Sequence, residues 1–391
     1  MMRVGVGQSQ KTVLADALED ATTIAMGNAQ LAKADLAVVF ATVDYQADYG
    51  GLFHTIHEIS GCDHLVGCSG MSVLTSAGEF EGEPAVAVLV LRSDDVSAMP
   101  FLVSSDDSST IGAAIRENIS SKFRENSLLV VLPDVRSISP EALVHQLGED
   151  GIRLPIVGAA ASGSPDGQYI YGWHDKEVVE AGVAGMLLTG AFRTEIGVAQ
   201  GCQPIGRPMQ ITRADGNVIY EVDGNPALDS LQVALESLTA EDLRQSGRVV
   251  FIGIAMDKEN LAPRRGDFLV RNLVGYDKES GAIAVSEGVS SDQLIQFHLR
   301  NSSSANKEIQ EIVLDLHERT RERPPAFGMY FNCLGRGKGL YGKANHDIQI
   351  IKQRFPDLPI IGFFGNAEFA PIGGRNFAHA YTGALVLCSD G

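Results

Sequence analysis

Short apolar runs of strand length recur along the chain, in a fixed order with helical stretches and glycine-containing loops. The first apolar run, at 36–40 (L-A-V-V-F), precedes a helical stretch at 49–60 and the step Leu65-Val66-Gly67. A polar loop and a second apolar run at 86–91 follow. Apolar runs that alternate with helices predict mixed β-sheets covered by helices, an α/β fold.

The same block appears twice more. It occupies 128–132, 140–148, 155–158 (P-I-V-G) and 183–188, and again 328–331, 346–355, 359–362 (P-I-I-G) and 384–387. Such self-similarity predicts one supersecondary unit, strand-helix-strand-Gly-loop-strand, used at least three times. The glycine that ends each short run suggests a strand end, where glycine permits a tight turn.

A chain of 391 residues is too long for one ordinary core, so we expect two domains. The segment 193–226 is rich in turn-forming residues, and we place the boundary there. The prediction is an N-terminal domain at 1–215 and a C-terminal domain at 216–391. In the second domain a helix at 227–238 precedes apolar runs that read as strands, at 249–254, 269–275, 282–285 and 294–299.

Composition excludes several partners. A formal net charge of −18 repels phosphate backbones and anionic lipids, so we expect neither nucleic acid nor a membrane surface as partner. No apolar stretch approaches the ~20 residues that span a bilayer, and the N-terminus does not resemble a signal peptide. Five scattered cysteines do not form a disulfide framework. We therefore expect a cytoplasmic protein with reduced thiols.

Motifs that would define a catalytic, metal or cofactor site are absent from the sequence. There is no phosphate-binding G-x-x-x-x-G-K-[ST] loop and no H-E-x-x-H; His54 and His57 lack a third ligand. Cys68 or Ser69 follows a buried strand, but neither has an assignable base. Small residues there also fit close approach of the backbone. We predict no cofactor and no metal.

The segment 331–337 (F-N-C-L-G-R-G) is the strongest candidate for chemistry. It places the Asn332 amide, the Cys333 thiol and the Arg336 guanidinium after a strand, between glycines. Loops at neighbouring strand ends converge on one crevice. Glu368 follows the P-I-I-G step of the third block, so we expect it nearby. Arg336 and Glu368 would then complement the carboxylate and ammonium of an amino-acid-like ligand. The alternative is an Arg-Glu pair that only holds two loops together.

The C-terminal half resembles the FIST family, named for F-box and intracellular signal transduction proteins. The resemblance rests on 266–275 (G-D-F-L-V-R-N-L-V-G), 296–300 (Q-F-H-L-R), 332–337 and Gly362-Phe363 followed by Glu368. The N-terminal half is similar to the FIST N-terminal domain through the less specific segments 65–70 and 156–163. Together the two domains would cover nearly the whole chain.

The resemblance implies a sensor that binds small molecules, amino acids or their relatives, and no established catalytic set. It puts Cys333 and Arg336 in the family's distinctive loop, and Glu368 where a Gly-Glu pair is common, although Ala367 replaces that glycine. Many relatives carry an output module, for which this chain has no space, so we expect a separate signalling partner. The predicted ligand-binding residues are Arg336, Cys333, Asn332, Glu368, Arg271, Gly67, Cys68 and Ser69.

Two other functions stay open. One is an enzyme that uses Cys333 as nucleophile in the field of Arg336, with His298 or His346 as base. The other is a scaffold whose repeated surface binds another protein.

Overall fold

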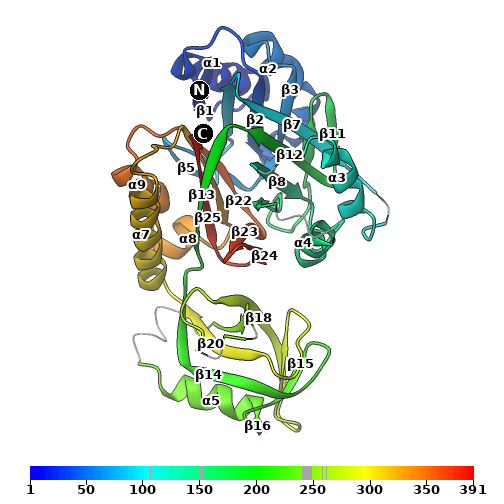
Figure 1. Ribbon diagram of the computed structural model, residues 1–391, viewed down its shortest axis with the longest axis vertical. Helices are drawn as coiled ribbons and strands as arrows, with labels where there is room; N and C mark the ends of the chain where they lie inside the picture. Colours follow the sequence, from blue (N-terminus) through cyan, green and yellow to red (C-terminus); the bar gives the residue numbers. More distant parts are fainter. Residues whose placement is uncertain (106, 125, 150–153, 240–248, 258, 261) are drawn as a thin grey trace. The chain divides into compact units, whose positions relative to one another are not determined.

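The chain forms two compact units. The computed structural model describes residues 1–105, 107–124, 126–149, 154–239, 249–257, 259–260 and 262–391. Unit 1 comprises Met1–Val198, Gln310–Ala378 and Thr382–Gly391; unit 2 comprises Ala199–Ile309 and His379–Tyr381. Each combines β-sheets with helices (Figure 1), which confirms the predicted α/β class. The domain boundary between residues 215 and 216 stays a prediction.

Unit 1 contains three copies of one chain path, each a strand, helix, strand, helix, strand, hairpin and strand. The first copy is β1 (Arg3–Ser9), α1 (Leu14–Ala29), β2 (Leu36–Thr42), η1 (Val43–Gly51), α2 (Leu52–Ser60), β3 (His64–Gly70), β4 (Ser72–Thr75), β5 (Gly78–Glu81) and β6 (Val86–Arg92). The second copy is β7 (Val96–Val103), α3 (Ile111–Ser120), β8 (Ser127–Pro133), α4 (Pro140–Gly148), β9 (Ile156–Ala159), β10 (Gly172–His174), β11 (Glu177–Val179) and β12 (Val183–Gly190).

The third copy is interrupted by most of unit 2, which also includes the start of α7 and the last residue of β24. It consists of β13 (Phe192–Ala199), α7 (Ser302–Arg319), β21 (Phe327–Cys333), α8 (Gly337–Tyr341), α9 (His346–Arg354), β22 (Ile360–Gly365), β23 (Glu368–Ile372), β24 (Arg375–His379) and β25 (Gly383–Asp390). The predicted repeat is thereby confirmed, although the sequence patterns did not reveal α1, α3 and α7.

Each copy lends its hairpin to the sheet of another copy. The first sheet has the order β1-β6-β2-β3-β10-β11, so its last two strands come from the second copy. The second sheet, β7-β12-β8-β9-β23-β24, ends with the hairpin of the third copy, and the third, β13-β25-β21-β22-β4-β5, with that of the first. The middle pairs β2/β3, β8/β9 and β21/β22 are parallel. This cyclic exchange joins the three copies into one unit.

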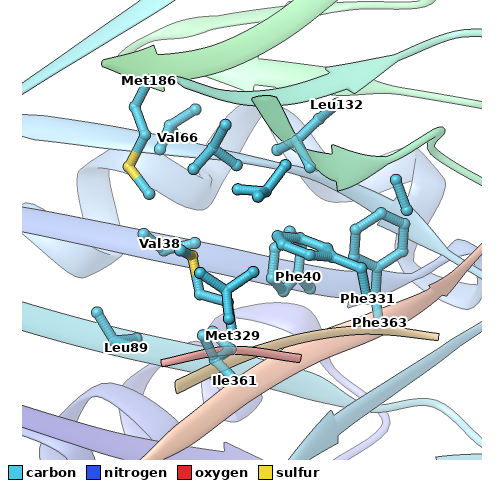
Figure 2. Close-up of a cluster of buried hydrophobic side chains, with 14 of the residues drawn as sticks. Val38, Phe40, Val66, Leu89, Leu132, Met186, Met329, Phe331, Ile361 and Phe363 are labelled. Carbon is cyan, nitrogen blue, oxygen red and sulfur yellow. The ribbon is translucent and has the colours of Figure 1, made fainter. Parts of the chain in front are cut away.

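The three sheets share a central core. Side chains at alternate positions of the middle strands point into it: Leu36, Val38 and Phe40 from β2, Leu128, Val130 and Leu132 from β8, and Phe327, Met329 and Phe331 from β21. Figure 2 shows side chains from all three sheets meeting there, with Phe40 close to Phe363. The ring centroids of this pair are 4.7 Å apart. The period of two along each strand leaves its other face for helices.

The sheet faces that point away from the central core differ between the three copies. Val39 of the first copy packs in a cluster with residues of α1 and α2, and Val131 of the second packs with α3 and α4. In the third copy the register puts Tyr330 at the same position, opposite the glycine of the next strand. A completely buried tyrosine therefore stands where the other copies have valine.

Within the described ranges, none of the helices is long and apolar enough to cross a membrane.

One glycine of each copy lies within the second parallel strand rather than in a turn at its end. A Cβ on Gly67, Gly158 or Gly362 would lie 1.7, 2.0 or 1.8 Å from a carbonyl oxygen of the neighbouring strand. Of the three, Gly158 has a positive φ, at 139°. The interpretation of these glycines as turn residues is wrong for Gly67 and Gly362, which are required by the close approach of two backbones.

Unit 2 is a closed barrel. Its strands pair in the order β14 (Cys202–Asp215), β20 (Leu294–Arg300), β17 (Val250–Ala255), β18 (Phe268–Asp277), β19 (Ala282–Val285) and β15 (Val218–Val222), and β14 also pairs with β15. The short β16 (Asn225–Pro226) and α5 (Ala227–Glu236) follow β15. The turn-forming residues near 206 lie at a register shift of β14, between Ile205 and Met209.

Candidate functional site

The loop after β21 leaves the sheet at the carboxyl end of the parallel pair and turns back at once. The amide of Arg336 donates to the carbonyl oxygen of Cys333 at 2.8 Å. Gly337 follows with φ of 62°, a conformation that favours glycine. A Cβ there would come within 2.6 Å of Oε2 of Glu81. The turn directs Arg336 inward, where the residue is 1% exposed.

Arg336 forms a buried ion pair with Asp347, in the first turn of α9. Nε donates to Oδ2 of Asp347 at 3.0 Å, and Nη2 donates to the hydroxyl of Tyr341 at 2.7 Å. The hydroxyl of Tyr330 donates to the same Oδ2 at 2.9 Å, and Nδ1 of His346 lies 2.9 Å from Oδ1. Burial raises the pKa of Asp347, but Arg336, His346 and Tyr330 together hold it well below its usual range. Both partners are therefore charged.

The exchanged hairpin β4–β5 brings two carboxyls of the first copy to this region. The amide of Ile348 donates to Oε1 of Glu79 at 3.0 Å, and the amide of Lys338 donates to the two oxygens of Glu81 at 2.9 and 3.0 Å. Burial, followed by the nearby Asp347, raises the pKa of Glu79 to about 8. The first copy thus holds the start of α8 and of α9 in the third.

Glu368, the first residue of β23, is completely buried. Its Oε2 accepts hydrogen bonds from the amide of Thr382 at 3.0 Å and from its hydroxyl at 2.7 Å. The amide of Cys333 donates to the carbonyl oxygen of Thr382 at 3.0 Å, so Thr382 is held from two sides. Burial raises the pKa of Glu368 to about 7, while Thr382, Arg336 and Cys333 act in the opposite direction. Cys333, Arg336 and Glu368 therefore meet in one region, as predicted.

We refer to these side chains as the Arg336 cluster: Glu79, Tyr330, Asn332, Cys333, Arg336, Tyr341, His346, Asp347 and Glu368. Three of its buried atoms, Nδ2 of Asn332, Oε1 of Glu368 and Oε2 of Glu79, have no hydrogen-bond partner among the described residues. An unsatisfied buried polar group costs about 1–3 kcal/mol, and native proteins contain few. Three of them in one cluster mark it as the candidate site.

Comparison with known proteins gives the family. Residues 35–225 match the FIST N domain, and residues 227–371 match the FIST C domain. This chain belongs to the FIST family. FIST domains are associated with signal transduction and the sensing of small ligands.

Relatives of similar length support the assignment to FIST. An uncharacterised protein of Mycobacterium bovis is 30% identical over 392 residues, which cover 100% of this chain and 99% of the relative. An uncharacterised protein of Mycobacterium tuberculosis is 29% identical over 389 residues and matched over the full length of both chains. Among solved structures, cyanuric acid hydrolase from A. caulinodans aligns over 100% of this chain and 99% of its own at 10% identity. The TM-score of this alignment is 0.34.

The predicted residues of the FIST N domain are all buried in β3. Gly67 lies against Val39 and Trp173, and Cys68 is in the central core, where burial raises its pKa well above the usual value. The hydroxyl of Ser69 donates to the carbonyl oxygen of Ser162 at 2.8 Å and so links the first two copies. Their contact with a ligand stays a prediction.

Arg271 lies in β18 of unit 2, whereas the other predicted residues belong to unit 1. The residue is 4% exposed. Its Nε forms an ion pair with Glu287, and its Nη1 donates to the carbonyl oxygen of Val270 at 3.0 Å. A ligand contact of Arg271 also stays a prediction.

The second copy of the repeat also has an Arg-Asp pair, at the end of β8, the strand that corresponds to β21. The environment of this pair is different. Nε of Arg136 lies 3.1 and 3.0 Å from the two carboxylate oxygens of Asp134. Its Nη2 donates to the carbonyl oxygens of Ile170 and Glu180, and the side chain is 41% exposed. This pair ties the strand end to a neighbouring loop.

Sequence reasoning missed Asp347, Tyr330 and Glu79. Tyr330 lies inside an apolar run, and Asp347 is indistinguishable from an ordinary acidic residue in the first turn of a helix. Glu79 reaches the cluster through the hairpin exchange, for which the sequence carries no local signal.

Within the described ranges, no group of three or more His, Cys, Asp or Glu side chains is arranged to hold a metal ion.

Proposed function

We propose that this FIST protein is a cytoplasmic sensor that binds an amino acid or a related small acid and signals through a separate protein. The observation that carries the proposal is the pair of completely buried, unpartnered atoms Nδ2 of Asn332 and Oε1 of Glu368. An amide donor suits a carboxylate, and a carboxylate oxygen suits an ammonium group. Five free, buried cysteines agree with a reducing compartment.

The sheet architecture does not require a polar side chain at the position of Tyr330. The first and second copies build the same sheet with valine at the position of Tyr330 and cover it with apolar residues. Buried charges are commonly less stabilising than apolar side chains of similar size. A polar cluster at a place where the other two copies are apolar is therefore a candidate for function.

A thermal-shift screen tests the proposal. Purified protein is heated with amino acids, small carboxylates and nucleotides, one at a time. A ligand at a hundredfold excess over its Kd stabilises the folded state by about 2.7 kcal/mol. We expect a dose-dependent rise in Tm with amino acids or small carboxylates.

Three substitutions connect such a response to the cluster. Glu368→Gln, Asn332→Ala and Arg336→Ala should each weaken binding at least tenfold. Arg136→Ala is the matched control, because it removes the Arg-Asp pair at the same strand end of the second copy. It should lower Tm without changing the affinity. Unchanged affinity in all three cluster variants, or no response to any compound, would refute the proposal.

A second candidate is a cysteine-dependent enzyme. The amide of Gly335 donates to Sγ of Cys333 at 3.5 Å, and the Cys333 side chain also interacts with the Glu368 carboxyl. A donor to sulfur stabilises a thiolate, and a carboxyl offers a base. Selective labelling of Cys333 by a mild thiol reagent at neutral pH would favour the enzyme. Equal labelling of all five cysteines would count against it.

A further inference from the structure

The buried carboxyl groups of the Arg336 cluster outnumber its buried guanidinium groups. Asp347, Glu79 and Glu368 are 0%, 5% and 0% exposed, and Arg336 is the guanidinium among them. It donates from Nε to Asp347, which is therefore the ionised partner. An isolated buried carboxylate is so unfavourable that the group takes up a proton instead. Glu79 and Glu368 are the carboxyls of this cluster that have no ion-pair partner of their own in the part of the chain that the structure describes.

Glu79 and Glu368 each have one carboxyl oxygen without a hydrogen-bond partner among the described residues. Glu79 lies near two further carboxyls, Asp347 and Glu81, whereas Glu368 has no carboxyl among the groups that shift its pKa. Its Oε2 accepts two hydrogen bonds from Thr382, while Oε1 has no partner among the described residues. The titratable groups that act on it are Arg336 and Cys333, from β21 and the loop after it. On the other side, β9 lies beside Glu368 with Ala159 and provides no titratable side chain. One oxygen of Glu368 is thus anchored to Thr382, and the other has no partner among the described residues.

The raised pKa of Glu368 agrees with this geometry. Burial raises its pKa to about 7, although Thr382 and Arg336 lower it. Near neutral pH the Glu368 side chain therefore exchanges between a carboxylic acid and a carboxylate.

We propose that the ligand is recognised through an ammonium group, which binds Oε1 of Glu368 and replaces the proton on that carboxyl. The inference rests on the proposed sensor function and specifies its ligand and its pH dependence. In the exchange, the O–H bond of Glu368 breaks and its proton passes to the solvent. The N–H of the ligand then donates to the carboxylate, so the buried charge is neutralised by the ligand.

Three matched probes separate the two ends of an amino acid. Alanine carries both groups, ethylamine only the ammonium and propanoate only the carboxylate. Calorimetric titration in two buffers that differ in ionisation enthalpy, phosphate and Bis-Tris at pH 6 and phosphate and Tris at pH 8, gives the number of protons released. We expect alanine and ethylamine to bind and to release close to one proton at pH 6, and few at pH 8. Because the proton must leave first below about pH 7, affinity should rise up to tenfold per pH unit to that point and then level off.

Glu368→Gln imitates the protonated carboxyl and should fold, yet lose ethylamine binding at least tenfold together with the proton release. Glu149→Gln is the control, because it removes a surface carboxylate that is 48% exposed. Binding of propanoate without ethylamine would leave the sensor intact and overturn the ammonium inference. Ethylamine binding without proton release at pH 6 would also overturn it. If none of the probes binds and the wider screen is flat, the proposed function fails as well.

Discussion

Nε of Arg336 and Oδ2 of Asp347 are 3.0 Å apart, and neither side chain has any exposed surface. Each charge has lost its hydration, so each depends on the other and on Tyr330, Tyr341 and His346 for compensation. Removal of one partner leaves the other buried and uncompensated. Removal of both leaves a site that can repack.

Arg336→Met and Asp347→Asn should therefore each destabilise the protein by about 3–5 kcal/mol. The double variant should lose less than the sum of the two, because no uncompensated charge remains. Urea unfolding of the four proteins gives the coupling free energy. Additive losses would mean that the pair does not act as a unit.

Because the three copies are equivalent, substitution of the glycine in the second parallel strand should destabilise the protein to a similar extent in each copy. Gly67→Ala, Gly158→Ala and Gly362→Ala would each bring a Cβ within 1.7–2.0 Å of a backbone carbonyl oxygen. All three should unfold at markedly lower urea concentration than the parent protein. Gly27→Ala, in α1, meets nothing within 4 Å and should stabilise by up to about 1 kcal/mol. A neutral result at any of the three inner glycines would contradict the close approach described there.

Local patterns were sufficient to predict the repeat. The apolar runs of β2, β8 and β21 are continuous because both faces of these strands are buried, one in the central core and one under helices. The glycine steps marked the strand beside each of them. Helix α1 was missed because alanine and threonine, rather than large apolar residues, occupy much of its buried face.

Pairing between distant segments was not predictable in the same way. The hairpin β4–β5 completes the sheet of the third copy beside β22, and the register joins Leu74 to Gly362. No residue of the hairpin indicates which of three similar sheets it will join. The proximity of Cys333, Arg336 and Glu368 was predictable from their positions after neighbouring strands. The ion-pair partner of Arg336 was not, because Asp347 depends on how a loop folds back.

The raised pKa of Glu79, about 8, makes stability depend on pH. The folded state binds this proton more tightly than the unfolded state, where the ordinary value is 4.5. Its stabilising contribution is therefore complete below about pH 4.5 and is lost as pH rises towards 8, by up to about 1.4 kcal/mol per pH unit. Glu368 adds a similar loss up to about pH 7.

Glu79→Gln keeps an oxygen acceptor for Ile348 but cannot ionise. This variant should match the parent near pH 5 and be the more stable protein at pH 9. Urea unfolding at pH 5, 7 and 9 measures the difference. A gap between variant and parent that stays constant with pH would show that Glu79 does not titrate in this range.

The two units should unfold in separable steps, because each has its own hydrophobic core. The single tryptophan, Trp173, is buried in unit 1, where its Nε1 donates to the carbonyl oxygen of Val39 at 3.2 Å. Its fluorescence follows unit 1, whereas far-ultraviolet circular dichroism follows both units.

Phe297→Ala empties part of the barrel core and should lower the free energy of unfolding of unit 2 by about 3–5 kcal/mol. We expect it to shift only part of the dichroism transition and to leave the fluorescence midpoint in place. If both signals move together by the same amount, the two units unfold as one cooperative body.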